Sequence, residues 1–253
     1  MLTEGIHSGA SGQIADTFRV ARYLLNRIED PETGVVSDPA FNVAIPPSRL
    51  TEIKASAQGI APGTAHLPLV DGAAPVTHDI VERIVNSTWR PALSIIGAEG
   101  LPPASNAGNV LRPMTALKLS LRLPPRCDSR KASARLKALL ESNPPYGAKV
   151  NFDADWEAQG WDAPELAPWL KESMDEASRS YFGKPAAYMG LGGTIPFMAM
   201  LGQRFPQAQF LITGVLGPRS NAHGPNEFLH IPTGRRVTCC VAQVIADHFS
   251  ACA

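Results

Sequence analysis

The residues best suited to chemistry lie in the segment 220–227, where a histidine stands among small, turn-forming residues. His223 is followed by Gly224 and Pro225, and the apolar run 210–216 precedes the segment. An apolar run bounded by Gly and Pro indicates a buried strand, which would place His223 on a tight loop at the strand's C-terminal end. Ligands bind at that edge in open α/β sheets. His223 is therefore a candidate metal ligand or general acid, and a structural histidine bonded to loop backbone is the alternative.

A glycine-rich turn is a second candidate site. The segment 190–196 contains Gly192, Gly193 and Thr194 and leads into an expected helix. Backbone N–H groups at such a helix N-terminus can hold a carboxylate or another anion. The dinucleotide-binding fingerprint does not fit, because Ile195 stands where its third glycine belongs. A purely structural turn is the alternative.

Three further polar residues lie on or beside expected strands. Arg122 falls on the polar face of a strand at 115–123, where leucines alternate with polar residues. A guanidinium held on a strand can clamp a carboxylate with two hydrogen bonds, although many strand arginines only face water. Asn109 precedes this strand, and His7 stands at a strand-to-turn junction that lacks the Gly-x-Ser-x-Gly pattern of a nucleophile elbow.

The composition is that of an ordinary globular protein and excludes several function classes. Among 253 residues, 23 Lys and Arg balance 23 Asp and Glu, which argues against binding to nucleic acid or to a membrane surface. No apolar run is long enough to span a bilayer, and the first residues do not form a signal peptide. None of the four cysteines forms a Cys-x-x-Cys pair. We therefore expect a cytoplasmic protein.

The hydrophobic pattern predicts an α/β (α+β) chain with two domains. Residues 1–153 should form a ferredoxin-like domain with a loop-rich insertion at about 31–88. Its expected elements are a strand ending at residue 7, a helix at 14–28, strands at 91–97 and 115–123, a helix at 128–140 and a strand at 148–152. Residues 154–253 should form a partial α/β layer. There we expect helices at 164–182, through residues 198–201 and at 237–249, with strands at 186–189 and 210–216.

Four segments in the same order resemble the di-zinc exopeptidase family that includes carnosinase, aminoacylase and succinyl-diaminopimelate desuccinylase (metallopeptidase family 20). These segments are residues 4–9, 119–124, 192–197 and 220–227. The resemblance implies a ferredoxin-like lid domain that forms a homodimer and a catalytic domain that binds two zinc ions. It implies hydrolysis of peptide or amide bonds in dipeptide-like substrates.

The same resemblance assigns roles to residues of this chain. His223 would be a metal ligand, and His7 would polarise the scissile carbonyl in the partner subunit's site. Arg122 would clamp the substrate carboxylate with Asn109 nearby, and Gly193 and Thr194 would contact that carboxylate from the catalytic side. A metal-activated water would attack while cationic donors stabilise the oxyanion.

Most of the family's metal ligands are missing from this sequence. The family carries a His-x-Asp motif, a bridging aspartate and a Glu-Glu pair before its lid, and none of them is present here. Leu191 also stands where relatives carry an acidic residue. We therefore expect a truncated version, consisting of the lid and the C-terminal part of the catalytic domain, that is inactive alone. A non-catalytic dimerisation or dipeptide-binding protein, or a half-enzyme completed by a separate N-terminal piece, are the alternatives.

Overall fold

The computed structural model describes residues 1–59, 69–190, 196–215, 217 and 220–252. Its contacts divide the chain into two compact units. Unit 1 contains residues 1–46, 82–161 and 190–199, and unit 2 contains residues 47–81, 162–189 and 200–253. Helices and antiparallel strands are both present, so the α/β (α+β) class predicted from the sequence is confirmed. Among the described residues, no helix is both long and apolar enough to cross a membrane.

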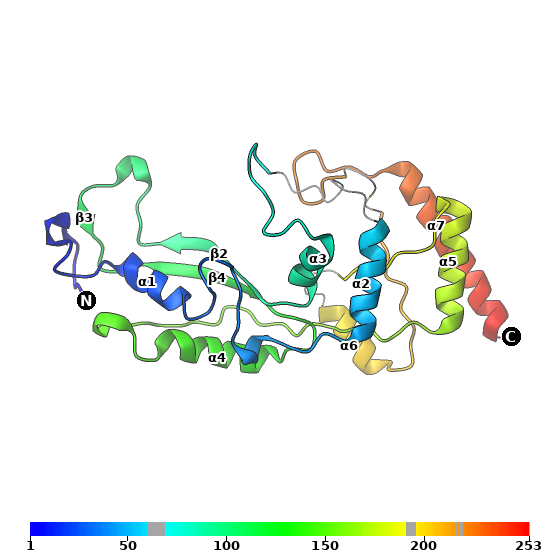
Figure 1. Cartoon of the computed structure of the whole chain (residues 1–253), viewed down its shortest axis with the longest axis horizontal. Helices are drawn as coiled ribbons and strands as arrows, with labels where there is room; N and C mark the ends of the chain where they lie inside the picture. Colours follow the sequence, from blue (N-terminus) through cyan, green and yellow to red (C-terminus); the bar gives the residue numbers. More distant parts are fainter. Residues whose placement is uncertain (60–68, 191–195, 216, 218–219, 253) are drawn as a thin grey trace. The chain divides into compact units, whose positions relative to one another are not determined.

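The strands of unit 1 form two short antiparallel ladders (Figure 1). β2 (Ala92–Glu99) pairs with β4 (Ala116–Arg122), and the register shifts between Ile95 and Gly97. β1 (Ile6–His7) pairs with β3 (Val110–Leu111). The alternating leucines of β4 are half-buried, as their period of two predicted.

Two helices of unit 1 begin where the sequence places a capping residue. The Asp16 carboxylate accepts the N–H of Arg19 at the start of α1 (Thr17–Leu25), and the Asp128 carboxylate caps α4 (Ser129–Glu141) by accepting the N–H of Lys131. One hydrophobic core joins these helices to their surroundings. Its buried members are Val20, Leu24, Ile28, Val36, Phe41, Cys127, Ala132, Leu136, Leu140 and Ala148.

The spacing in the sequence predicts a buried helix face made of Ile14, Phe18, Ala21, Leu25 and Ile28, and the buried face of α1 differs from it. Ile28 is buried as expected, but Val20 and Leu24 are the buried residues within the helix, whereas Ile14 and Phe18 are exposed. The helix carries two apolar stripes, and the stripe with Val20 and Leu24 packs inward. Just after the helix, the Arg27 guanidinium donates hydrogen bonds to the carbonyl oxygens of Leu139, Ser142 and Asn143 at the end of α4.

The described residues of unit 1 also include four single turns of 3-10 helix. These are η1 (Ser8–Ala10), η2 (Pro39–Phe41), η3 (Ala104–Asn106) and η4 (Pro145–Gly147). Most of α3 (Ile80–Thr88) lies in this unit, where Val85 is buried.

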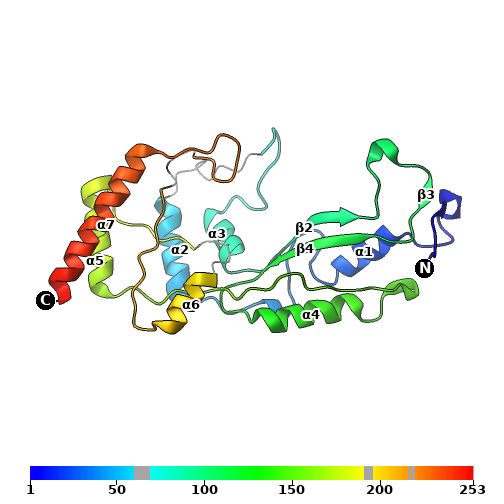
Figure 2. The ribbon, with the colours of Figure 1, turned by 180° about the vertical axis from the view of Figure 1, so that it is seen from behind.

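Unit 2 is helical in its described residues. α5 (Pro168–Phe182) and α7 (Ile231–Cys252) lie side by side in both views (Figures 1 and 2). Ser173 and Ala177 give α5 a small-residue face, and the Ser173 hydroxyl donates to the Asp247 carboxylate across the pair at 2.5 Å. α2 (Pro47–Gly59) and the C-terminal part of α6 (Pro196–Arg204) complete the unit.

Three strand predictions are wrong. Residues 148–152, 186–189 and 210–215 form no strand ladder in the structure. A strand needs a hydrogen-bonded neighbour, and none of these segments has one among the described residues. The helices were predicted more accurately, although α7 begins six residues earlier than expected. Residues 47–81 of the expected insertion cluster with unit 2, and the predicted domain boundary near residue 153 stays a prediction.

Candidate functional site

His7 lies at the end of β1 with one ring nitrogen already occupied. Its Nδ1 accepts a hydrogen bond from the N–H of Gly9 at 3.0 Å, and a Cβ on Gly9 would meet the same nitrogen at 3.0 Å. Because Nδ1 is the acceptor, this hydrogen-bond pattern assigns the proton of the neutral ring to Nε2. The residue is exposed, so the Nε2–H group is available to donate to an oxygen atom of a ligand.

The structure brings Asn109 beside His7. The N–H of Ser8 donates to the carbonyl oxygen of Asn109 at 2.9 Å, next to the β1–β3 pair. Arg122 ends β4, roughly 20 Å along the strand from its first residue, Ala116. Arg122 is exposed, and among the described residues its guanidinium has no ion-pair partner. Asn109 therefore neighbours the histidine.

His223 lies at the tip of a closed loop in unit 2. The N–H of Phe228 donates to the carbonyl oxygen of Ser220 at 3.1 Å, which closes the loop. The backbone N–H of His223 donates to the Glu227 carboxylate at 3.0 Å, so this acidic residue positions the backbone of the histidine. The predicted loop is present, although the strand expected before it is not.

The loop backbone is held in an uncommon conformation. Asn221, His223 and Asn226 have φ values of 54°, 58° and 58°, in the left-handed region that non-glycine residues seldom adopt. A Cβ at Gly224 would come within 2.5–2.7 Å of the Asn221 carboxamide, so a larger residue there would displace this side chain. This backbone exposes the His223 side chain at the surface of unit 2.

The described residues do not fit a two-metal centre. Among residues 1–59, 69–190, 196–215, 217 and 220–252, no group of three or more His, Cys, Asp or Glu side chains could hold a metal ion. A dinuclear zinc site needs several carboxylates and imidazoles. His223 could therefore contribute one ligand at most. Gly193 and Thr194, the predicted carboxylate-binding residues, lie outside the described residues.

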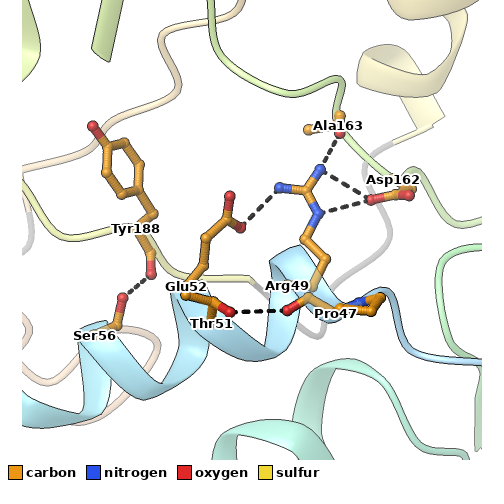
Figure 3. A network of polar contacts seen from close by, with 8 residues as sticks. All are labelled: Pro47, Arg49, Thr51, Glu52, Ser56, Asp162, Ala163 and Tyr188. Atoms are coloured by element: carbon orange, nitrogen blue, oxygen red, sulfur yellow. Dashed lines mark hydrogen bonds and ion pairs between the residues drawn. The ribbon is translucent and has the colours of Figure 1, made fainter. Parts of the chain in front are cut away.

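Sequence reasoning missed a polar cluster around Arg49 in unit 2 (Figure 3). The Arg49 guanidinium contacts the Glu52 carboxylate at 2.8 Å and the Asp162 carboxylate at 3.2 Å, and it donates to the carbonyl oxygen of Ala163. The Arg49 and Asp162 side chains are only 17% and 16% exposed. The sequence around Asp162 is typical of a solvated linker, but in the structure this residue is an ion-pair partner.

Through these contacts, the cluster links α2 to the segment before α5. Burial alone would lower the pKa of Arg49, but the hydrogen bonds and charges of Glu52 and Asp162 outweigh it and raise that pKa. The Ser56 hydroxyl donates to the carbonyl oxygen of Tyr188 and fastens α2 to the segment after α5 as well. The i, i+3 spacing of Arg49 and Glu52 was visible in the sequence, but the distant partner was not.

Comparisons with known proteins point to peptidases. No protein-family model matches the chain. A cysteinylglycine-S-conjugate dipeptidase of Corynebacterium striatum is 26% identical over 138 residues, which are 54% of this chain and 30% of that protein. The solved structure of a dipeptidase of Saccharomyces cerevisiae, Dug1p, matches 96% of this chain and 52% of its own, with a TM-score of 0.71 and 18% identity.

Two further structures match over nearly the whole chain. Human carnosine dipeptidase 1 has a TM-score of 0.67 at 18% identity and covers 98% of this chain and 52% of its own. An M20 family metallo-carboxypeptidase of Sulfolobus solfataricus, Sso-CP2, has a TM-score of 0.68 at 17% identity. The match covers 96% of this chain and 55% of Sso-CP2. The chain thus spans about half the length of these structures. It has the fold of that part of the M20 family peptidases, and the resemblance indicated by its four motifs is confirmed.

Proposed function

We propose that this chain serves in the hydrolysis of peptide or amide bonds in dipeptide-like substrates. The observation that carries the proposal is its similarity to a dipeptidase over 138 residues of sequence, together with the fold it shares with peptidases. The equal numbers of acidic and basic residues fit a small-molecule substrate better than nucleic acid or a membrane surface.

Two side chains of unit 1 would contact the substrate. The Nε2–H of His7 would donate a hydrogen bond to the oxygen on which negative charge develops when a carbonyl is attacked, in the site of a partner subunit. The Arg122 guanidinium would bind the substrate carboxylate. Gly193 and Thr194 would bind the same carboxylate through backbone and hydroxyl donors.

The proposal extends to metal binding and to activity. His223 would be a ligand of zinc, which in such sites activates water and polarises the carbonyl. Because the described residues provide no group of three ligands, we expect this chain alone to hold zinc below stoichiometry and to be inactive. A complete centre would then need ligands from a second polypeptide.

A homodimer through unit 1 is also part of the proposal. Phe18, Tyr23 and Ile14 on and beside α1 are exposed and apolar, and they offer a surface that a second copy could cover. Cys127, Cys239 and Cys240 are free thiols, which supports a reducing, cytoplasmic location.

The first experiment combines metal analysis with substrate binding. After dialysis against zinc, the purified chain should contain less than one zinc ion per molecule and should release no amine from a cysteinylglycine S-conjugate. It should still bind this dipeptide, and Arg122→Leu should weaken binding by about tenfold, because a charge-assisted pair is lost. Arg130→Leu, an exposed arginine on α4, is the matched control. Two zinc ions with turnover would disprove the proposed incompleteness, and failure to bind any dipeptide would disprove the hydrolytic role.

A non-catalytic dipeptide-binding protein is the second candidate. The lack of a three-ligand group among the described residues favours it. The chain would then bind dipeptides without turnover even when a polypeptide carrying the missing ligands is added. His7→Gln separates the two functions, because it should reduce turnover in the completed enzyme without weakening dipeptide binding. His78→Gln, at another exposed histidine, is the control.

A further inference from the structure

Two cysteines stand side by side on α7, and the proposed function uses neither of them. Cys239 and Cys240 are adjacent in the sequence, and no other two of the four cysteines are neighbours. Both are free thiols, Cys239 exposed and Cys240 half-buried. α7 is the red helix of Figure 1, where it lies beside α5. Both sulfur atoms therefore belong to one regular element of unit 2.

The helix places the two thiols at the border of its packed face. Val244, one turn after Cys240, is only 6% exposed, whereas Cys239 lies on the solvent side. Burial, followed by the charge of Cys239, raises the pKa of the Cys240 thiol, so Cys240 is protonated at neutral pH. A reagent in solution therefore meets Cys239 first, with the Cys240 thiol next to it.

An intact helix does not allow these two thiols to close as an ordinary disulfide. Disulfide-bonded residues usually have Cα atoms about 4.4–6.8 Å apart, whereas adjacent Cα atoms are about 3.8 Å apart. Adjacent side chains also diverge by about 100° around the helix axis. An atom that bridges the two sulfurs relieves this limit, because it adds two bonds of about 2.3 Å in place of one sulfur–sulfur bond of about 2.0 Å.

The two sulfur atoms determine which kind of centre can bridge them. Thiolates are soft ligands and select soft centres. A structural zinc ion needs more ligands than two thiolates, and no group of three or more His, Cys, Asp or Glu side chains that could hold a metal occurs in the part of the chain that the structure describes. A trivalent arsenic atom that carries one organic group needs only two sulfur atoms to complete its bonds. This class of compound therefore matches the pair.

We propose that Cys239 and Cys240 form a binding site for a trivalent arsenic compound that carries one organic group. With phenylarsine oxide, each sulfur forms one bond to arsenic, the arsenic–oxygen double bond breaks, and both thiol protons leave with that oxygen as water. Arsenic stays trivalent and neither sulfur is oxidised, so no other reactant is needed. Once Cys239 has reacted, the second bond forms within the molecule, which strengthens binding over that of one thiol by about a hundredfold or more.

The test titrates the whole purified chain with phenylarsine oxide, in a buffer whose reductant is a phosphine and contains no thiol. Intact mass spectrometry should show one phenylarsenic group per chain, added with the loss of one water molecule. Excess 2-mercaptoethanol should leave this adduct in place, because it offers one thiol at a time. The vicinal dithiol 2,3-dimercaptopropanol should remove it.

Single substitutions separate the pair from the other thiols. Cys239→Ser and Cys240→Ser should each weaken binding by about a hundredfold, because one thiol remains. Cys252→Ser is the matched control on the same helix and should leave binding unchanged, since Cys252 lies roughly 18 Å along the axis from Cys240.

Cys239 is exposed, so Cys239→Ser decides the question even where the half-buried Cys240 tolerates serine poorly. Three results would overturn the proposal: no adduct on the unchanged chain, binding of equal strength in Cys239→Ser, or removal of the adduct by 2-mercaptoethanol.

Discussion

Units 1 and 2 bury their apolar side chains to different extents. Unit 1 has a continuous core of buried residues from α1, α4 and the segments between them. Among the described residues of unit 2, the buried apolar side chains are Ile53, Leu170, Ala177 and Val244. Several large apolar side chains of unit 2 stay exposed, including Met200, Phe205, Ile212, Phe228, Ile245 and Phe249.

This difference shows which parts of the chain find their packing partners within it. In unit 1 the apolar stripes of two helices face a strand ladder and one another. In unit 2 the helix pair α5–α7 packs through one face, while the segments expected to be strands have no ladder among the residues that the structure describes. Exposed apolar surface of this kind is typical of an interface. We therefore expect unit 1 to be the more stable part and unit 2 to depend more on association.

The largest effect should come from truncating an aromatic residue in the core of unit 1. Phe41 is 0% exposed, so Phe41→Ala should cost ~3–5 kcal/mol of unfolding free energy through lost burial and a cavity. Phe249 in unit 2 is 76% exposed, and Phe249→Ala should change stability by less than ~0.5 kcal/mol. Hydrogen exchange by mass spectrometry, resolved by unit, would measure both. An equally large effect of Phe249→Ala would show that unit 2 buries this face in solution.

The next effect concerns the ion pair that fastens α2. Arg49→Met removes an ion-pair partner of the half-buried Asp162 carboxylate and should destabilise unit 2 by ~1–3 kcal/mol. Lys118→Met removes one member of the exposed pair in unit 1 and should leave its unfolding midpoint unchanged. Urea titration followed by hydrogen exchange of α2 and β4 peptides would compare them. Equal losses of stability in the two variants would contradict the view that burial decides how much each ion pair contributes to stability.

The elements that could be predicted from the sequence are those whose causes are local. Asp128 and the apolar spacing of Ala132, Leu136 and Leu140 lie within about four helical turns, so α4 could be located from the residue pattern alone. The fold class, the loop at His223 and the turn at His7 were predictable for the same reason. The family resemblance was recognisable because its four motifs are short and contiguous.

The features that the sequence did not predict depend on distant partners. The Arg27 guanidinium, just after α1, donates a hydrogen bond to the carbonyl oxygen of Leu139, which is 112 residues away in α4. The Arg49–Asp162 hydrogen bond joins residues 113 positions apart. The strands expected at 148–152 and 210–216 have suitable composition, but a strand exists only when a neighbour accepts its hydrogen bonds. The roles of the site residues stay predictions, because they rest on the resemblance.

A smaller effect should follow pH in unit 1. The Asp38 carboxylate accepts the N–H of Ala40 at 2.9 Å and pairs with the Arg135 guanidinium at 2.8 Å. Burial alone would raise the pKa of Asp38, but the bonds from Arg135 and Ala40 and the Arg135 charge lower it below its ordinary value of 3.8. The carboxylate therefore stabilises the fold above that pH, and the contribution is lost as pH falls through the lower, folded pKa.

Asp38→Asn should accordingly cost about 1 kcal/mol at neutral pH and progressively less as the pH falls from the ordinary carboxyl pKa through the lower, folded pKa. Thermal unfolding of the unchanged chain and of Asp38→Asn, from neutral to acidic pH, would measure the difference in their stability. Arg135→Met should give the same pH dependence, whereas Arg130→Met should not. If this difference in stability does not change with pH, the effect of the substitution comes from packing rather than from charge.

The smallest effect has the opposite sign and lies in unit 2. The Tyr188 hydroxyl is buried and has no hydrogen-bond partner among the described residues, and Figure 3 shows its ring directed away from the Arg49 cluster. Burial, followed by the Asp175 and Glu52 charges, raises the pKa of this phenol, so it stays protonated at neutral pH. Tyr188→Phe removes an unsatisfied donor and should stabilise unit 2 by about 0.5 kcal/mol. Tyr146→Phe, at an exposed position of unit 1, should leave the stability of that unit unchanged. A destabilised Tyr188→Phe would mean that the hydroxyl bonds to a group that reaches unit 2 in solution, and the contrast between the units would then reflect a missing partner of unit 2.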